Sequence, residues 1–242
     1  MTKVDDYARA LRDREDAEAY LLEHSGLPGP RANLELARAA AEVRPAAELR
    51  RWASSATEEF VAFCGVLGLG RLLADGDATM LQELRRHAND PRWRIREAVA
   101  MALQRWGEAD FDGLAAAMAE WARGSWLERR AAAAALCEPA LLTEPRRVQA
   151  ALGVLETATA AVAAAGPADR RSEEFKALRK GLGYCWSVAV AAAPQIGAPV
   201  FEALVERAAA SGDRDLRWIA RENLRKRRVD PDWAAALLRR LG

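Results

Sequence analysis

The chain is poor in the residues that build metal sites and nucleophilic active sites. Its 242 residues include only two histidines, His24 and His87, and three cysteines. Both histidines are isolated, so the sequence contains neither a zinc-binding spacing nor a histidine-dependent nucleophile arrangement. We therefore expect no metal ion and no cofactor.

The sequence also lacks long apolar runs and any pattern typical of disulfide pairing. Cys64, Cys137 and Cys185 are widely separated, and each lies in an apolar helical run where a free thiol packs as a small hydrophobe. The first residues, MTKVDDYARALRDREDAEAYL, are acidic and amphipathic without the apolar core of a signal peptide, and no later run reaches membrane-spanning length. We expect a reduced, cytoplasmic protein with no membrane partner.

Net charge is nearly absent as well. Thirty-six lysines and arginines face 35 aspartates and glutamates, which leaves a formal charge of +1. The field of the whole protein therefore indicates neither nucleic acid nor membrane as a partner, and only local clusters of charge can do so.

Alanine is abundant while aromatic residues make up 7% of the chain, a balance that favours helix over sheet. Apolar periodicity, interrupted by short segments rich in Gly, Pro, Asp and Asn, predicts an all-α fold. The expected helices span residues 3–24, 31–43, 46–54, 57–74, 77–88, 91–106, 110–123, 126–137, 144–165, 170–193, 197–210, 214–227 and 231–241.

A repeat underlies these helices. RIREAVAMALQRWG (94–107) follows a HEAT-like scheme, DLRWIARENLRKRR (215–228) repeats it, and SWLERRAAAAAL (125–136) is a looser copy. Helical pairs of this kind cannot bury their apolar stripes alone, so they stack on one another. We expect one domain over 1–242, a monomeric HEAT-like α-solenoid of about six antiparallel helical pairs with a concave groove.

The helix expected at 91–106 carries the main candidate site. At about 100° per residue, Ile95, Ala98, Val99, Ala102, Leu103 and Trp106 form a buried stripe. Trp93 and Glu97 lie one turn apart on the opposite face, where they would line the groove. Alternatively, Trp93 packs on an adjoining helix and Glu97 pairs with Arg94 or Arg105, a surface arrangement that contributes little stability.

Arginines and tryptophans gather near the same repeats. In the repeat register Trp218 falls at the position of Glu97, and Arg221, Glu222 and Arg225 lie beside it. Arginine pairs bidentately with phosphate and an indole stacks on a base, which suits nucleic acid, although interleaved acids also fit a solvated surface. The glycines of GVLGLG (65–70) and RKGLG (179–183) are explained by close helix packing, and Tyr184 and Trp186 are expected in the core.

Three stretches from Trp52 to Leu136 carry a family resemblance: WASSATEEFVAFCGVLGLGRLL, LQELRRHANDPRWRIREAV and MAEWARGSWLERRAAAAAL. With Glu59–Phe60 opening a helix, Trp93 four residues before Glu97, and Trp126–Leu127 before Arg130, this third of the chain resembles the bacterial DNA-alkylation-repeat (AlkD-like) DNA glycosylases. The family carboxylate is typically aspartate, whereas Glu97 is one methylene longer. The family's late groove tryptophan has no clean counterpart, because Trp218 lies only near its position and Glu222 aligns about as well.

The resemblance implies either a DNA glycosylase that hydrolyses the N-glycosidic bond of cationic alkylated purines in duplex DNA without a metal ion, or a non-catalytic DNA-binding protein related to such an enzyme. On this basis Trp93 contacts the deoxyribose, Glu97 stabilises the developing oxocarbenium ion, and Arg130 contacts a phosphate. Arg94, Trp218, Arg221, Glu222 and Arg225 are the further candidate DNA-binding residues. The alternative is a non-enzymatic HEAT-repeat scaffold with a protein partner in the concave groove. A groove lined by converging arginines would favour DNA, and a mixed or apolar groove would favour a protein.

Overall fold

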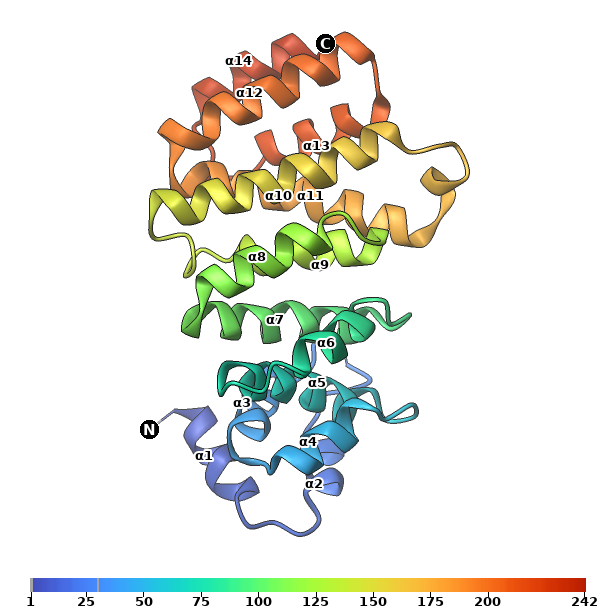
Figure 1. Ribbon diagram of the computed structural model, residues 1–242, viewed down its shortest axis with the longest axis vertical. Coiled ribbons are helices and arrows are strands. Elements are labelled where there is room, and N and C mark those ends of the chain that lie inside the picture. The colour runs from blue at the N-terminus through green and yellow to red at the C-terminus, as the bar shows by residue number, and fades with distance from the viewer. Residues whose placement is uncertain (1, 30) are drawn as a thin grey trace. The chain divides into compact units, whose positions relative to one another are not determined.

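The computed structural model describes residues 2–29 and 31–242, and within them the chain forms fourteen α-helices, one short 3-10 helix and no strand (Figure 1). The predicted all-α fold is confirmed. The helices divide between two compact units, Met1–Ala109 and Asp110–Gly242. The expectation of a single continuous domain stays a prediction.

The first unit is built around one almost wholly buried helix, α5. α5 is apolar on nearly all sides. Five helices pack against it: α2, α3, α4, α6 and α7. Gly65 and Gly68 let α4 approach closely, and Gly70 does the same for α7, as expected from the sequence. The helices of this unit are α1 (Lys3–Leu11), α2 (Ala17–Glu23), α3 (Leu34–Val43), α4 (Ala46–Ala53), α5 (Glu59–Ala74), α6 (Met80–Ala88) and α7 (Trp93–Ala109).

The second unit is arranged in two layers. Of its helices, α8, α10, α12 and α14 pack in succession as one layer, and α9, α11 and α13 pack in succession as the other, as Figure 1 shows. Every helix therefore contacts neighbours in both layers. The bounds are α8 (Phe111–Trp121), α9 (Trp126–Leu136), α10 (Pro145–Ala164), η1 (Asp169–Arg171), α11 (Glu173–Ala192), α12 (Pro194–Ser211), α13 (Arg214–Leu224) and α14 (Pro231–Leu241).

The prediction of one helix over 3–24 is wrong, because two helices form there: α1 ends at Leu11 and α2 begins at Ala17. The buried side chain of Arg44 donates hydrogen bonds to the carbonyl oxygens of Leu11 and Arg14. These carbonyl groups lie at the end of α1 and just beyond it. The carbonyl groups left without a helical partner where α1 ends therefore bind a side chain at least thirty residues away in the sequence. No local sequence pattern indicates this contact.

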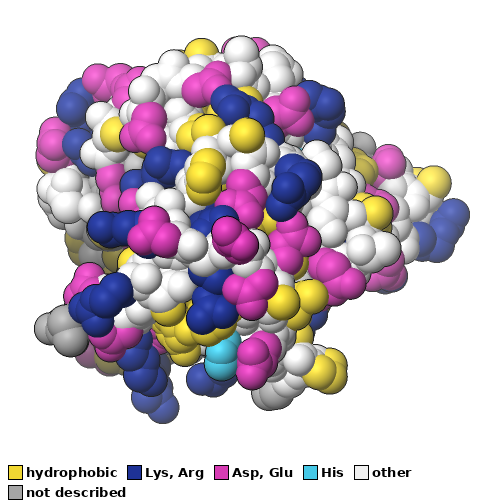
Figure 2. Space-filling model, turned by 90° about the horizontal axis from the view of Figure 1, so that it is seen from below, with side chains coloured by type: hydrophobic (Ala, Val, Ile, Leu, Met, Phe, Trp, Pro, Cys, Tyr) yellow, Lys and Arg dark blue, Asp and Glu magenta, His cyan; other side chains and the backbone are white. Residues whose placement is uncertain are grey.

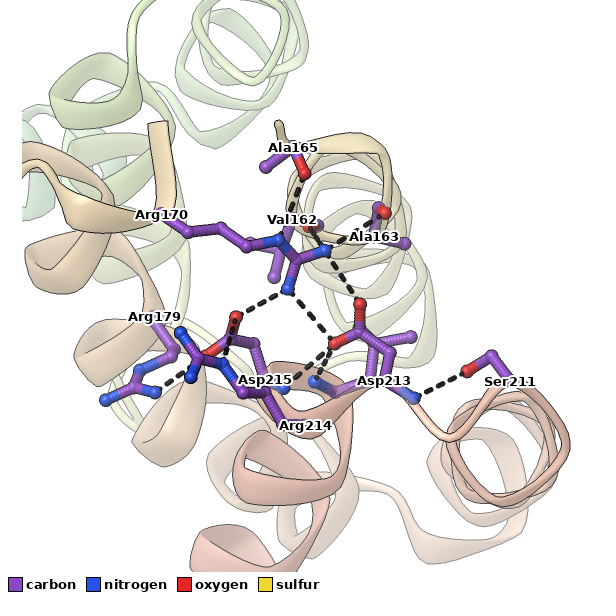
Figure 3. A network of polar contacts seen from close by, with 10 residues as sticks. Val162, Ala163, Ala165, Arg170, Arg179, Ser211, Asp213, Arg214 and Asp215 are labelled. Atoms are coloured by element: carbon purple, nitrogen blue, oxygen red, sulfur yellow. Dashed lines mark hydrogen bonds and ion pairs between the residues drawn. The ribbon is translucent and has the colours of Figure 1, made fainter. Parts of the chain in front are cut away.

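A buried ion network fastens three helices of the second unit (Figure 3). The side chain of Asp215, only 2% exposed, pairs with Arg170 and, at 2.7 Å, with Arg179. Arg170 also pairs with Asp213 at 2.7 Å and donates to carbonyl oxygens at the end of α10, including that of Ala165 at 3.0 Å. The network joins the end of α10 to α11 and to the start of α13.

Two expectations about buried residues have different outcomes. Cys64, Cys137 and Cys185 are free and buried, and the pKa of the Cys137 thiol is raised by its hydrogen bond with Cys185 and by burial. Trp186 is buried as expected, but Tyr184 is 47% exposed, so its assignment to the core was wrong. In the part of the chain that the structure describes, no helix is both long and apolar enough to span a bilayer.

Candidate functional site: a cleft at the start of α7

A cleft of about 290 Å³ lies in the first unit where α3, α5 and α7 meet. The lining is largely apolar, with Leu34 of α3, Phe63 of α5 and Met101 of α7. It also includes side chains of both positive and negative charge. The cleft is lined by Arg31, Ala32, Leu34, Phe63, Trp93, Arg94, Glu97 and Met101. The two residues proposed from the sequence as catalytic, Trp93 and Glu97, therefore share one cavity.

Hydrogen bonds between Asp90 and Arg92 hold the turn before α7. Asp90 accepts a hydrogen bond from the backbone of Arg92 at 2.8 Å and two more from its side chain. Burial by itself would raise the pKa of Asp90, but these hydrogen bonds outweigh it and hold the pKa below its usual value. The Arg92 guanidinium also donates to the Ser55 carbonyl at 2.9 Å, which ties this turn to the segment before α5.

Trp93, Glu97 and Met101 form one stripe along α7 at intervals of four residues and line the cleft together. Trp93 is 53% exposed, the highest value among the four exposed large hydrophobic side chains of the described residues, and Glu97 is half-buried. On the opposite face Ile95, Ala98, Val99, Ala102 and Leu103 are buried as predicted, whereas Trp106 is only half-buried.

The two arginines that the sequence offered as partners for Glu97 form ion pairs elsewhere. Arg94 pairs with Glu59, the first residue of α5, at 2.9 Å. Arg105 pairs with Glu42 of α3. The Arg94 guanidinium also lies over the Trp93 ring, 4.6 Å from its centroid. Arg94, proposed as a DNA-binding residue, is thus engaged by its own unit.

Asn33, which precedes α3, fixes the segment that contributes Arg31, Ala32 and Leu34 to the cleft lining. The Asn33 side chain caps α3 by accepting from the backbone of Leu36 at 3.0 Å, and it donates to Tyr7 Oη and to the His24 carbonyl. Its backbone donates to the Ser25 carbonyl at 2.8 Å. The N-cap pattern of RANLEL is readable in the sequence, but the placement of Arg31 and Leu34 beside Trp93 is not.

The second unit carries a separate group of charged and aromatic side chains, which we call the α11–α13 strip. Trp218 lies against α11, where a Cβ on Gly183 would come within 2.8 Å of the indole, and the Arg179 guanidinium lies 4.5 Å from its ring centroid. The exposed ring of Tyr184 is flanked by Arg228, 4.4 Å away, which also donates to its hydroxyl at 2.8 Å. The strip consists of Arg179, Tyr184, Trp218, Glu222, Arg225, Lys226 and Arg228.

Three of the candidate residues from the late repeat lie together and one does not. Trp218, Glu222 and Arg225 follow one face of α13 and the turn after it, with Glu222 paired to Arg225 at 3.1 Å. Arg221 instead donates to the carbonyl oxygens of Leu241 and Gly242 at the end of α14. Arg130 of α9 lies beside Gly181 of α11: a Cβ added at Gly181 would be in ordinary van der Waals contact with the Arg130 side chain.

Many arginines bind acceptors of their own unit. Arg217 donates to the Ala208 and Ala209 carbonyls at the end of α12, and Arg129 donates to the Ala122 carbonyl at the end of α8. Such contacts satisfy the last carbonyl groups of a helix and complement its dipole. On the face shown in Figure 2, dark blue basic side chains lie among magenta acidic ones. The surface charge is therefore mixed in sign on this face.

Sequence reasoning missed several residues of both regions. Phe63 and Met101 resemble ordinary core positions, and Tyr184 was assigned to the core because α11 is apolar around it. Across residues 2–29 and 31–242, no group of three His, Cys, Asp or Glu side chains is placed to hold a metal ion. Comparison with known proteins found no matching family model, no similar curated protein and no similar solved structure.

Proposed function

We propose that the helical pairs of this protein are HEAT-like repeats stacked as an α-solenoid. The internal likeness of 94–107, 125–136 and 215–228 supports this architecture, and so does the alternation of two helical layers in the second unit. In such a stack one helix of each pair contributes to a binding surface.

We further propose that the protein binds duplex DNA and hydrolyses the N-glycosidic bond of cationic alkylated purines at the cleft. The observation that carries this proposal is the pairing of Trp93 and Glu97, an exposed indole and a carboxylate one helical turn apart in one largely apolar cavity. This pairing is complementary to an electron-poor sugar attached to a cationic base, because an indole face attracts positive charge and a carboxylate stabilises it.

The chemistry that these groups would support is simple. As the C1′–N bond breaks, its electron pair passes to the purine, which leaves as a neutral base, while positive charge develops on the sugar. Glu97 stabilises that charge and positions the water whose oxygen forms the new bond to C1′, and the water proton passes to the carboxylate. An alkylated purine is already cationic, so no general acid is needed.

The α11–α13 strip supports a nucleic-acid partner. Arg179 lies over the Trp218 ring, and Lys226 and Arg228 lie over the Tyr184 ring. Arg179 also pairs with Asp215, and Arg225 and Lys226 share Glu222. The strip therefore carries four cations beside two carboxylates, one of which, Asp215, also pairs with Arg170. Basic groups interleaved with aromatic ones bind phosphates and stack on bases.

A second candidate function is a protein-interaction scaffold. It is favoured by the apolar lining of the cleft and by the engagement of Arg94, Arg217 and Arg221 with acceptors of their own units. An apolar cleft with charges of both signs at its rim suits a peptide at least as well as a phosphate backbone.

The deciding experiment measures release of 7-methylguanine and 3-methyladenine from methylated duplex DNA by the wild type and by Glu97→Gln. We expect release by the wild type and its loss in the variant, with DNA binding retained. Glu108→Gln, which removes an exposed carboxylate from the same helix, is the matched control and should leave release unchanged. Absence of both base release and salt-sensitive DNA binding in the wild type would overturn the DNA proposal and favour the scaffold.

A further inference from the structure

The indole of Trp93 is supported on one side by an ion pair that crosses between two helices. Arg94 lies over the Trp93 ring at 4.6 Å and donates to Glu59 Oε2 at 2.9 Å. The side chains of Arg94 and Glu59 are 19% and 28% exposed, so the pair is much less open to solvent than the indole that it supports. Indole, guanidinium and carboxylate therefore lie in contact in that order.

The support is anchored in the most buried helix of the first unit. Glu59 is the first residue of α5, and the residues from Phe60 to Gly70 that follow it are all buried. The indole and the guanidinium belong to the first two residues of α7, whose start is also held by the turn at Asp90 and by the hydrogen bond from Arg92 to the Ser55 carbonyl. The ion pair adds a side-chain link from the first residue of α5 to the residue beside Trp93.

Arg94 also lines two cavities. It lines the cleft of about 290 Å³ with Trp93 and Glu97, and it lines a neighbouring cavity of about 350 Å³ with Glu58, Glu59 and Phe60. Because both cavities border its side chain, the guanidinium has room to leave the Trp93 ring once its carboxylate is removed. A planar guanidinium stacks on an aromatic face, whereas a compact ammonium group does not.

We propose that Glu59 is a positioning residue for Trp93 and acts through Arg94. Arg94 is then an internal support of the cleft and not a ligand of DNA. The consequence for activity rests on the proposed function, but the placement of the indole can be measured independently of it.

The test uses fluorine NMR of the full-length protein labelled with 5-fluorotryptophan. The Trp93 signal is identified as the one missing from Trp93→Phe. We expect Glu59→Gln and Arg94→Lys each to shift and broaden the Trp93 signal while the signals of the other seven tryptophans of this eight-tryptophan chain keep their positions. Glu42→Gln, which removes the ion pair with Arg105 in the same unit, is the matched control and should leave the Trp93 signal in place.

A double substitution shows whether Glu59 acts through Arg94. In an Arg94→Met background, Glu59→Gln should have no further effect on the Trp93 signal. An unchanged Trp93 signal in Glu59→Gln, or an equal shift with and without Arg94, would overturn the inference.

Base release provides the second measurement. If the wild type is a glycosylase, Glu59→Gln should lower kcat on the order of tenfold with KM little changed, because a misplacement of about 1 Å costs up to about a hundredfold. A wild type that releases no base refutes the proposed function, whereas the fluorine signal still decides whether Glu59 positions Trp93.

Discussion

At the scale of single residues, close approach between helices depends on glycine at a few positions. A Cβ added at Gly70 of α5 would lie 2.5 Å from the Cα and carbonyl oxygen of Ala102 in α7, so backbone and not a flexible side chain occupies the space. Gly153 of α10 is also helical, but it is exposed and has no atom within 4 Å of the added Cβ. The two glycines therefore differ in what a methyl group would meet.

We therefore expect a glycine-to-alanine substitution to change the free energy of unfolding in opposite directions at these two positions. Gly70→Ala should lower the free energy of unfolding by about 1–3 kcal/mol, because α5 and α7 must move apart. Gly153→Ala should raise it by about 0.5–1 kcal/mol, because alanine restricts the unfolded chain and favours helix. Urea unfolding followed by circular dichroism measures both. Equal effects of the two substitutions would show that the approach of α5 to α7 does not depend on glycine at position 70.

Trp93 is the residue at which helical periodicity was most informative. Its position opposite the buried stripe of α7 predicted exposure, and the exposed indole agrees with that prediction. Periodicity did not reveal the guanidinium stacked on the ring, because Glu59, which holds Arg94 there, is 35 residues away in the sequence.

At the scale of elements, the start of α13 depends on a charged cap. The Asp213 side chain accepts from the backbone of Asp215 at 2.8 Å and of Leu216 at 3.0 Å, and it pairs with Arg170. Burial alone would raise the pKa of Asp213, but these hydrogen bonds outweigh it and hold the pKa below its usual value of 3.8.

The direction of this shift determines how stability depends on pH. A lowered pKa in the folded state means that Asp213 contributes stability above its unfolded value of 3.8, which is lost as the pH falls through the lower folded value. Asp213→Asn keeps a capping side chain but loses the charge that pairs with Arg170. We expect this variant to be less stable than the wild type at about pH 6, with the difference shrinking towards about pH 3. Urea unfolding across this range provides the measurement, and a difference independent of pH would contradict the assignment.

At the scale of the whole molecule, the formal charge of +1 gives no long-range attraction to DNA. Any DNA binding must therefore come from local groups of cations such as the α11–α13 strip. Arg225 in this strip has a side chain that is 66% exposed, and Arg240 of α14 is exposed on a helix that packs on α12 and α13. Removing either arginine changes the net charge from +1 to 0, because each contributes one positive charge.

This pair of arginines separates local charge from net charge. If the strip contacts phosphates, Arg225→Ala should weaken binding to duplex DNA and reduce the slope of log affinity against log salt by about 1. Arg240→Ala should change neither quantity. Fluorescence anisotropy over a series of salt concentrations distinguishes the two, and equal effects of both substitutions would mean that the strip is not a DNA contact.

The sequence by itself determined the helical class, the positions of most helices and the buried stripe of α7, because these follow from propensity and from a period of about 3.6 residues. It also predicted the exposure of Trp93 beside Glu97. Only the tertiary structure decided that α1 ends at Leu11, that Arg94 pairs with Glu59, that Arg221 binds the end of α14 and that Tyr184 is exposed. Each of these depends on a contact or a surface shared with a distant helix, and local periodicity carries no information about which distant residues meet.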